Sequence, residues 1–530
     1  MTFPWFLSLG VGFLSLSQEI LWVRLMSFLL GGAPVAFSFT LTCYLIGIAL
    51  GAWLGKRFCD SSRDLYKVSA FVLLIAALTD TLPSYLGPII GFNGFATGLW
   101  QVVVPAMCII WTAGVKSVLF PIAHHLGSNQ SGAKVGSSVS NIYFGNIIGS
   151  TLGPLITGFW LLDILTVDQC FRLVAFISLL LAVLCAWRSS RKSFSLQVVS
   201  AMTGLALVIV PSSTFMHSAA DRHTQDLSGA VVTGDVRHLI ENKHGVIHTI
   251  SFDGRLDDVI FGGNIYDGRF NTSIRSDSNG INRVYLLAAL KHKPKRVLVV
   301  GMSGGAWTQV LRGFPGVESI DVVEINPGYL DLMRRYPLVA SVLDDPRLQV
   351  HVDDGRRWLK RNPTTKFDLI VMNNTYYWRA YSTNLLSQEF MRELRSHMKP
   401  GSVLAFNSTT SLDPFMTVAT VFPYTYRFGG FAYAGATDFR ATPDIAKSRL
   451  MDLKDADGQP VFFESDFDVG AVGDKLAHAE LEPVSLMLQH HPDVEIGVIT
   501  DANMLSEYRH GKRYKLPLID HFLPDIGRRP

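Results

Sequence analysis

The chain has 530 residues, of which 48% are hydrophobic and only 17% are charged. This length and apolar content exclude a single soluble domain, and a net charge of +3 spread over the chain does not indicate a nucleic-acid partner. Residues 1–211 hold 11 of the 47 Lys and Arg residues and 6 of the 44 Asp and Glu residues. The composition therefore predicts a membrane domain at 1–211 followed by a soluble part.

All five cysteines lie in the apolar part, at Cys43, Cys59, Cys108, Cys170 and Cys185. Their placement excludes a small secreted module held together by disulfides, and they do not have the spacing of metal ligands. We therefore expect no metal site.

Seven apolar stretches approach the length of about 20 residues that a helix needs to cross a bilayer. The first is too long for a cleavable signal peptide, lacks a basic start and contains Gln18, Glu19 and Arg24. We expect an α-helical bundle of about seven spans with the lipid bilayer as its partner, in the inner (cytoplasmic) membrane of the cell. The expected spans are 6–30, 36–54, 68–90, 99–122, 139–162, 171–187 and 194–210.

Small residues recur at every fourth position in two of these stretches. This spacing lets helix backbones approach closely, so we expect packing inside the bundle, and the same glycine-rich faces offer a route to oligomers. The two rows are Gly47, Gly51 and Gly55, and Gly145, Gly149 and Gly153.

Four ionisable residues fall at membrane depth, namely Glu19, Arg24, Asp80 and Lys116. Charges there are costly and usually face a partner or a water-filled cavity. One interpretation is a polar site for a substrate headgroup or an ion. The other is pairing between helices or within one, for example Glu19 with Arg24, together with snorkelling near helix ends.

Basic residues in short loops predict the orientation of the bundle. They lie in every second loop, which places the N-terminus in the cytoplasm and, after seven spans, the soluble part outside. These residues are Lys56, Arg57, Arg63, Lys67, Lys134, Arg188, Arg191 and Lys192.

The soluble part begins with a predicted linker at 212–229. Short β-rich runs with turn signals, such as "GVIHTISFDGRL" and "VIFGGNIYDGRF", then predict a small antiparallel β domain at 230–290. From 291 to 530 strand and helix signals alternate, which predicts a doubly wound α/β domain with a parallel sheet.

Four buried strands of this α/β domain are each followed by glycine or polar residues. A glycine turn before a helix N-terminus lets a ligand approach the backbone, and an acid at the end of the second strand can bind both hydroxyls of a ribose. The strands are 297–300, 320–325, 348–352 and 367–372, and the residues at their ends are Gly301, Ser303, Gly305, Glu324, Asp353, Asp354, Asn373 and Asn374.

The motifs "VLVVGMSGG", "VVEINP", "VHVDDGRRWL" and "FDLIVMNN" resemble those of the spermidine synthase family of aminopropyltransferases. That family shares the Rossmann-like fold of S-adenosylmethionine (SAM) methyltransferases. The stretch "YYWRAYSTNLLSQEFMRELRSHMKPGSVLAFN" resembles its bacterial subgroup in which the domain is fused to a multi-span membrane region. The resemblance covers about 230–410 and implies SAM or decarboxylated SAM as the co-substrate, without a metal.

The resemblance also implies roles for the residues at the strand ends. Glu324 would bind the ribose hydroxyls and Asp354 the adenine amino group, with Asp353 supporting Asp354. The nucleoside and methionyl portions would be lined by Gly301, Ser303 and Gly305.

Three positions depart from the family pattern. Gly304 and Asn373 stand where the family has an Asp that holds the donor's amine and its catalytic Asp, and Tyr376 replaces a further acid. An attacking alkylammonium has a pKa of about 10 and must lose a proton, which an Asn cannot accept. We therefore do not expect ordinary spermidine synthesis from putrescine.

Three functions fit this altered site. The first is displacement at the propyl carbon next to the sulfonium, with release of 5′-methylthioadenosine. Its nucleophile is a neutral small-molecule acceptor, or the amine or carboxylate of SAM itself in a cyclisation that needs no acceptor. The second is methyl transfer to a membrane-associated acceptor, and the third is nucleoside binding by a transporter or sensor without catalysis.

The acceptor pocket is expected after the fourth strand. Tyr376 and Tyr377, with Asn373, are the candidate catalytic residues, because aromatic faces stabilise a sulfonium or amine cation. Trp378 and Arg379 are candidate substrate contacts, and Arg379 would favour full SAM by binding its carboxylate. The alternative is that these aromatics only pack against neighbouring structure. Further candidate acceptor contacts, at the family's equivalent segment, are Asn282 and Tyr285.

The expected chemistry conflicts with the expected orientation. SAM is made and used in the cytoplasm, whereas seven spans would place its pocket outside. Three explanations are open: span seven lies in the interface, span one is re-entrant, or the soluble part faces outside and is fed through the membrane domain. Loop charge says little about a domain of this size, and of these outcomes we expect the soluble part in the cytoplasm.

Overall fold

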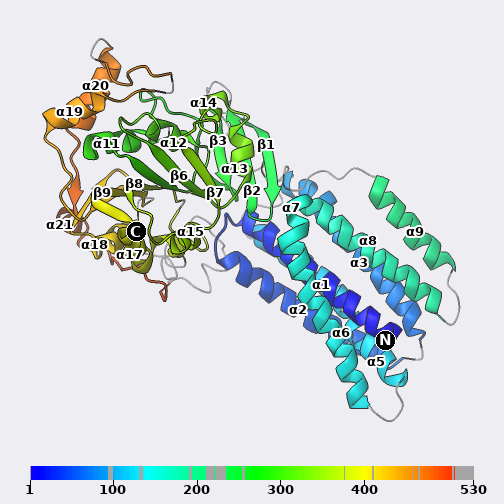
Figure 1. Cartoon of the computed structure of the whole chain (residues 1–530). Coiled ribbons are helices and arrows are strands. Elements are labelled where there is room, and N and C mark those ends of the chain that lie inside the picture. The colour runs from blue at the N-terminus through cyan, green and yellow to red at the C-terminus, as the bar shows by residue number, and fades with distance from the viewer. Residues whose placement is uncertain are drawn as a thin grey trace. The chain divides into compact units, whose positions relative to one another are not determined.

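The computed structural model describes residues 2–507 except 62, 93–99, 131–134, 190–193, 210–215, 217–219, 221–233, 253–256, 278, 375, 409–410, 456, 464–465 and 504–506. The chain divides into two compact units, of which the first ends at Val246 and the second begins at Ile247 (Figure 1). Apart from Met216 and Ala220, the expected linker 212–229 lies outside the described residues.

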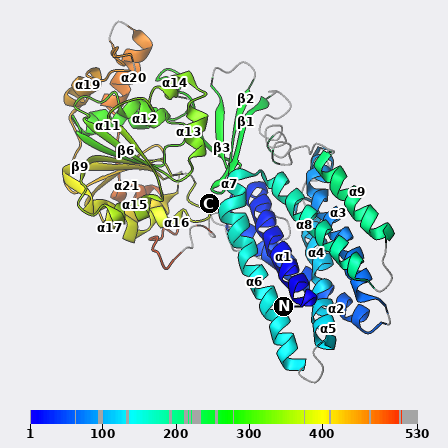
Figure 2. The same cartoon turned by 45° about the vertical axis from the view of Figure 1, so that its right-hand side comes forward.

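The first unit contains a bundle of long apolar helices that run side by side (Figures 1 and 2). Within the described residues five helical stretches are long and apolar enough to cross a membrane, namely Phe3–Leu29, Val35–Cys59, Val103–Ser128, Gly136–Ile164 and Val167–Arg188. The expected count of seven spans is therefore not confirmed. The helices are α1 (Phe3–Leu29), α2 (Val35–Cys59), α3 (Leu65–Phe92), α4 (Trp100–Ser117), α5 (Leu119–Gln130), α6 (Val135–Ile156), the π-helical turn Thr157–Leu161, α7 (Leu162–Ile164), α8 (Val167–Arg188) and α9 (Phe194–Ile209).

Both rows of glycines lie at contacts between helices of this chain. A Cβ atom on Gly51 would lie 2.1 Å from the carbonyl oxygen of Gly114 in α4, and one on Gly149 would lie 1.9 Å from that of Leu9 in α1. The expected close packing is therefore present within the bundle. Helices of the same chain cover these glycines, and oligomer formation through the glycine-rich faces stays a prediction.

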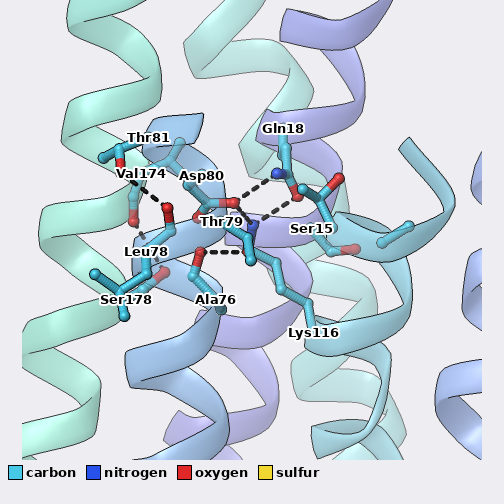
Figure 3. A network of polar contacts seen from close by, with 12 residues as sticks. Ser15, Gln18, Ala76, Leu78, Thr79, Asp80, Thr81, Lys116, Val174 and Ser178 are labelled. Atoms are coloured by element: carbon cyan, nitrogen blue, oxygen red, sulfur yellow. Dashed lines mark hydrogen bonds and ion pairs between the residues drawn. The ribbon is translucent and has the colours of Figure 1, made fainter. Parts of the chain in front are cut away.

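A buried ion pair joins three helices of the bundle (Figure 3). The Nζ atom of Lys116 lies 2.5 Å from Oδ1 of Asp80 and 2.6 Å from Oε1 of Gln18, whose Nε2 donates to the same Asp80 oxygen at 2.5 Å. The side chains of Lys116 and Asp80 are 1% and 0% exposed. The interpretation of pairing therefore holds for Asp80 and Lys116. The suggested pairing of Glu19 with Arg24 differs from the contact in the structure, where Arg24 donates to the backbone carbonyl of Lys243.

The expected antiparallel strands form a four-stranded sheet with the order β1-β2-β3-β4. The strands are β1 (Gly234–Asn242), β2 (Gly245–Phe252), β3 (Val259–Gly262) and β4 (Ile265–Arg269). Gly263 and Asn264 connect β3 to β4 with φ angles of 59° and 67°, the backbone of a tight hairpin turn. The boundary between the two units falls near the start of β2, so the expected separate domain at 230–290 is not confirmed.

The second unit is built on an eight-stranded sheet with the order β12-β10-β11-β9-β8-β5-β6-β7. The strands from β9 to β7 in this order pair in parallel, and β10, β11 and β12 add antiparallel pairs at the other edge. They are β5 (Arg296–Val300), β6 (Ser319–Glu324), β7 (Leu348–Val352), β8 (Phe367–Met372), β9 (Met398–Asn407), β10 (Tyr424–Phe428), β11 (Phe431–Gly435) and β12 (Glu482–Pro483).

Helices lie on both faces of this sheet (Figure 1), as its near-continuous apolar strands require. They are α11 (Asn282–Leu290), α12 (Ala306–Leu311), α13 (Gly328–Met333), α14 (Pro337–Ala340), α15 (Gly355–Arg361), α16 (Thr383–Leu386), α17 (Gln388–Ser396), α18 (Leu412–Ala419), α19 (Pro443–Met451), α20 (Phe467–Ala477) and α21 (Val484–His490).

The strand order places a switch point between β5 and β8. From β5 the chain proceeds to β6 and β7 on one side, and then returns to β8 and β9 on the other. Open α/β sheets bind ligands in the crevice at such a point, beyond the carboxyl ends of the strands. Here the backbones lie close together, since a Cβ atom on Gly301 would be 2.8 Å from the carbonyl oxygen of Asn373.

Candidate active site

A cavity of about 350 Å³ lies at the switch point. It is lined by the end of β4, the segment before α11, the glycine turn between β5 and α12, and the residues that follow β8. Of the residues singled out from the sequence, six line it: Ser303, Gly304, Gly305, Asn373, Asn374 and Tyr376.

The glycine turn has a strained backbone that leaves no room for a side chain at Gly304. Gly301, Ser303 and Gly305 have φ angles of 82°, 47° and 79°. A Cβ atom on Gly304 would lie 2.1 Å from Cδ1 of Ile260 in β3. An acid at this position would require the side chain of Ile260 to move out of the space that it fills.

The carboxylate of Glu324 supports the glycine turn through hydrogen bonds to its backbone. Its side chain is 3% exposed, and its Oε2 accepts the backbone N–H groups of Met302 at 2.7 Å and Ser303 at 3.3 Å. Its Oε1 accepts the N–H of Asn326 at 2.8 Å. Burial raises the pKa of this carboxyl above its usual value. Because Glu324 supports the turn and does not line the cavity, ribose binding stays a prediction.

Asp353 and Asp354 lie at the same edge of the sheet, after β7, and outside the cavity lining. Asp354 caps α15 by accepting the N–H of Arg357 at 2.8 Å. Asp353 accepts the N–H of Asp354 at 2.7 Å and forms ion pairs with Arg357 and Arg361. The support of Asp354 by Asp353 is thus present, while contact with adenine stays a prediction.

Polar amides follow β8 at the floor of the cavity. Asn373 and Asn374 both line it. The side chain of Asn374 is buried, and within the described part of the chain neither atom of its amide has a hydrogen-bond partner. A buried amide without a partner costs free energy unless a ligand or water satisfies it. This amide is a neutral donor and acceptor that faces the cavity.

The aromatic cluster divides between the cavity and the core. Tyr376 lines the cavity and stacks on Trp378 at 5.5 Å with an interplanar angle of 24°. Tyr377 packs against the core of the α/β sheet, and Trp378 is only 4% exposed. Arg379 does not line the cavity and lies beside Gly263, at the β3–β4 turn. Packing therefore accounts for Tyr377 and Trp378, and their positions do not support the suggested contacts with substrate.

The two candidates in α11 do not line the cavity either. The hydroxyl of Tyr285 donates to the carbonyl of Thr272 at 2.9 Å, and its ring packs on Phe462. Asn282 lies at the start of the helix, also outside the lining. Arg283, which lies between these two residues in α11, does line the cavity.

The sequence analysis missed the charged residues of the cavity wall, which are Asp267, Arg269 and Arg283. Asp267 accepts a hydrogen bond from the hydroxyl of Tyr329, and burial raises the pKa of Asp267. Arg269 pairs with Asp257 at 3.3 Å. The motif "YDGRF" in the second hairpin was the available signal, because its Asp and Arg alternate with apolar residues that pack on the glycine turn.

Fold and site together define an α/β domain of doubly wound topology with a cavity at its switch point. Residues 284–416 match the family described as "Spermine/spermidine synthase domain". The resemblance of the motifs is therefore confirmed, and the chain carries a spermidine-synthase-like domain.

Known proteins extend this similarity beyond the domain. The chain is 24% identical over 404 residues to polyamine aminopropyltransferase 2 of Streptomyces coelicolor, which covers 74% of this chain and 71% of that protein. It is 24% identical over 475 residues to the polyamine aminopropyltransferase of Mycobacterium tuberculosis, covering 84% and 88%. The crystal structure of a spermidine synthase in complex with the transition state analogue AdoDATO has 18% identity and a TM-score of 0.34, covering 38% of this chain and 74% of that one. The two relatives are named as transferases, as expected for an enzyme.

Proposed function

We propose that the chain is a multi-pass protein of the inner membrane whose α/β unit uses SAM or decarboxylated SAM as a co-substrate. In the reaction a nucleophile attacks the propyl carbon next to the sulfonium, and 5′-methylthioadenosine leaves. The observation that carries this proposal is the cavity at the switch point, lined by Ser303, Asn373 and Asn374, within a domain that matches the spermidine synthase family. Glu324 and Asp354, at the ends of β6 and β7, would bind the nucleoside.

Putrescine is a poor acceptor for this cavity. Gly304, Asn373 and Tyr376 supply no carboxylate. Among the described residues that line the cavity the one acidic side chain is Asp267, which accepts a hydrogen bond from Tyr329. Arg283, which forms no ion pair among the described residues, adds positive charge that repels a dication, whereas the charge of Arg269 is paired with Asp257. The wall therefore favours a neutral or anionic nucleophile.

The carboxylate of SAM itself can act as the nucleophile without a general base from the protein. A carboxylate is ionised at neutral pH, so no base has to remove a proton before it attacks. Its oxygen would form a bond to the γ carbon, the bond between that carbon and the sulfonium would break, and the electron pair would leave with neutral methylthioadenosine. The companion product is a γ-lactone. Intramolecular attack gains from high effective concentration, which offsets the missing general base.

The test is incubation of the detergent-purified protein with SAM alone, followed by mass spectrometry. Release of methylthioadenosine without added acceptor, together with the lactone or its hydrolysis product, is the expected result. Unchanged SAM after addition of membrane extract would contradict the proposal. Formation of S-adenosylhomocysteine there would favour methyl transfer, and methylthioadenosine binding without any turnover would favour a transporter or sensor.

Asn373→Asp provides the second arm of this test. Restoring one acid does not restore the acid at Gly304, where Ile260 occupies the space. We therefore expect no strong putrescine-dependent formation of spermidine by this variant. Robust spermidine formation would show that Asn373 alone determines the acceptor.

A further inference from the structure

Arg283 is a partly buried guanidinium in the cavity wall with no carboxylate partner. Its Nε donates to the carbonyl of Gly280 at 2.9 Å, and its Cζ lies 4.8 Å from the ring centroid of Phe431. In the described part of the chain no acidic side chain lies within the 4.0 Å of an ion pair, and Asp277 acts on it only at longer range. Burial lowers the pKa of this guanidinium.

This arrangement suits one ligand chemistry. Arg is always charged, its planar fork matches a carboxylate, and the contacts with Gly280 and Phe431 fix its orientation before a ligand arrives. We propose that Arg283 binds the α-carboxylate of SAM, so that the substrate is SAM and not its decarboxylated form. This proposal rests on the proposed function, because it assumes that the donor occupies the cavity.

Binding measured by calorimetry tests this assignment with SAM, decarboxylated SAM and methylthioadenosine as probes. We expect SAM to bind at least about tenfold more tightly than its decarboxylated form, because the hydrogen bonds between a guanidinium and a carboxylate are charge-assisted and strong. In Arg283→Gln this preference should be lost while methylthioadenosine binds as before, and Arg283→Lys should retain part of it. Arg440→Gln, at an exposed arginine paired with Asp438, is the matched control.

The outcomes separate the two proposals. Binding of methylthioadenosine without any preference for SAM would overturn the role of Arg283 and leave the proposed function standing. Binding of an acidic amino acid to the methylthioadenosine complex, dependent on Arg283, would assign the carboxylate to an acceptor and overturn the choice of SAM. Failure of methylthioadenosine to bind the wild-type protein would overturn the proposed function itself.

A second, independent observation concerns the two ends of helix α1. At its start, the ring of Phe3 lies 5.1 Å from the Cζ atom of Arg188 and 5.7 Å from the ring of Tyr66. At its end, Arg24 donates to the carbonyl of Lys243. The helix is continuous between Phe3 and Arg24, which at 1.5 Å per residue separates them by about 30 Å, the thickness of the hydrocarbon core.

Lys243 and Arg188 therefore lie at opposite ends of α1. Further bonds hold the Lys243 end in place, since Lys243 pairs with Asp163 at 2.9 Å and Glu241 accepts the N–H of Val167 at 2.9 Å. The Arg188 end gathers the exposed basic side chains of the neighbouring loop, Lys56, Arg57, Arg63 and Lys67. Basic loops mark the cytoplasmic side.

We infer that the unit following Lys243 faces away from the cytoplasm. In the described part of the chain no stretch after Lys243 qualifies as a further span, so the unit stays on the side of Lys243. This side is opposite to the cytoplasmic side that is expected from where SAM is made. Contacts at both ends of α1 determine it, without a count of spans.

Thiol labelling of intact cells tests this inference. In a variant with all five cysteines replaced, Thr364→Cys reports on the second unit and Asp60→Cys on the basic end, since both residues are exposed. A membrane-impermeant maleimide should label Thr364→Cys in intact cells and Asp60→Cys only after permeabilisation. Labelling of Thr364→Cys only after permeabilisation would overturn the inference. Equal labelling of both in permeabilised cells shows that each cysteine is present and accessible to the reagent.

Discussion

Glu324 shows how a residue can matter for a ligand without lining its cavity. Three backbone N–H groups, from Met302, Ser303 and Asn326, point at one buried carboxylate. The positive φ angles of the turn persist because these bonds hold them. The acid therefore shapes the glycine turn before any ribose arrives.

Replacing this carboxylate should weaken nucleoside binding. Glu324→Gln leaves one acceptor oxygen for three donors, and a lost hydrogen bond to a charged group costs about 1.5–3 kcal/mol. We expect the affinity for methylthioadenosine to fall at least about tenfold in calorimetric titration. Glu318→Gln is the control, because Glu318 directly precedes the same strand and is 65% exposed. Equal affinity of both variants and the wild type would remove Glu324 from the site.

At the scale of elements, the glycine rows determine which helices pair. Gly149 lies where α6 approaches α1, and a Cβ atom there would be 1.9 Å from the carbonyl of Leu9. In the same helix Gly136 has open space around its Cα atom, with nothing within 4 Å of an added Cβ.

Alanine at these two positions should have opposite effects. Gly149→Ala forces the helices apart and should destabilise the protein by about 1–3 kcal/mol. Gly136→Ala meets no atom and gains helix propensity, worth up to about 1 kcal/mol. Thermal unfolding in detergent measures both. A stable Gly149→Ala variant would show that α1 and α6 are further apart than described.

The buried Asp80–Lys116 ion pair should stabilise the contact between helices of the bundle only as long as both partners are present. Removing one partner of a buried ion pair leaves an uncompensated charge and typically costs about 3–5 kcal/mol. We expect Lys116→Met to destabilise the bundle by this amount, and Asp80→Asn combined with Lys116→Met to be milder than Lys116→Met alone. Lys67→Met, at an exposed lysine of the same unit, should change stability by less than about 0.5 kcal/mol. An additive double variant would indicate that the pair is not coupled.

The sequence predicts elements better than it predicts contacts between them. The strands β5 to β8 were recognisable because buried parallel strands appear as continuous apolar runs. The partner of Lys116 was not, because it depends on the rotation of three helices about their axes. In α11 the sequence favoured Asn282 and Tyr285, but only Arg283 lines the cavity. Neighbouring helix positions point about 100° apart, and no local pattern fixed the register of this helix.

For the whole molecule, Glu241 in β1 couples stability to pH. Burial raises the pKa of this carboxyl to about 7, with Arg24 acting in the opposite direction. The folded protein therefore holds this proton more tightly than the unfolded chain does. Stability from this group is fully present below the usual Glu pKa of about 4.3 and decreases as pH rises through about 7.

The measurement is thermal unfolding in detergent from pH 5 to pH 8. We expect the midpoint of the wild type to fall across this range by more than that of Glu241→Gln, which cannot ionise. The exposed Glu480 provides the control variant Glu480→Gln, which should follow the wild type. Parallel curves for the wild type and Glu241→Gln would show that Glu241 is ionised throughout.

The five cysteines, all free in the structure, lie in the helical unit and end at Cys185, so the remainder of the chain contains no thiol. Disulfides form and persist in oxidising compartments, where unpaired thiols are a hazard for folding. A catalytic unit without cysteine can neither form a wrong disulfide nor require a correct one. Its folding is thus indifferent to the redox potential on whichever side of the membrane it emerges.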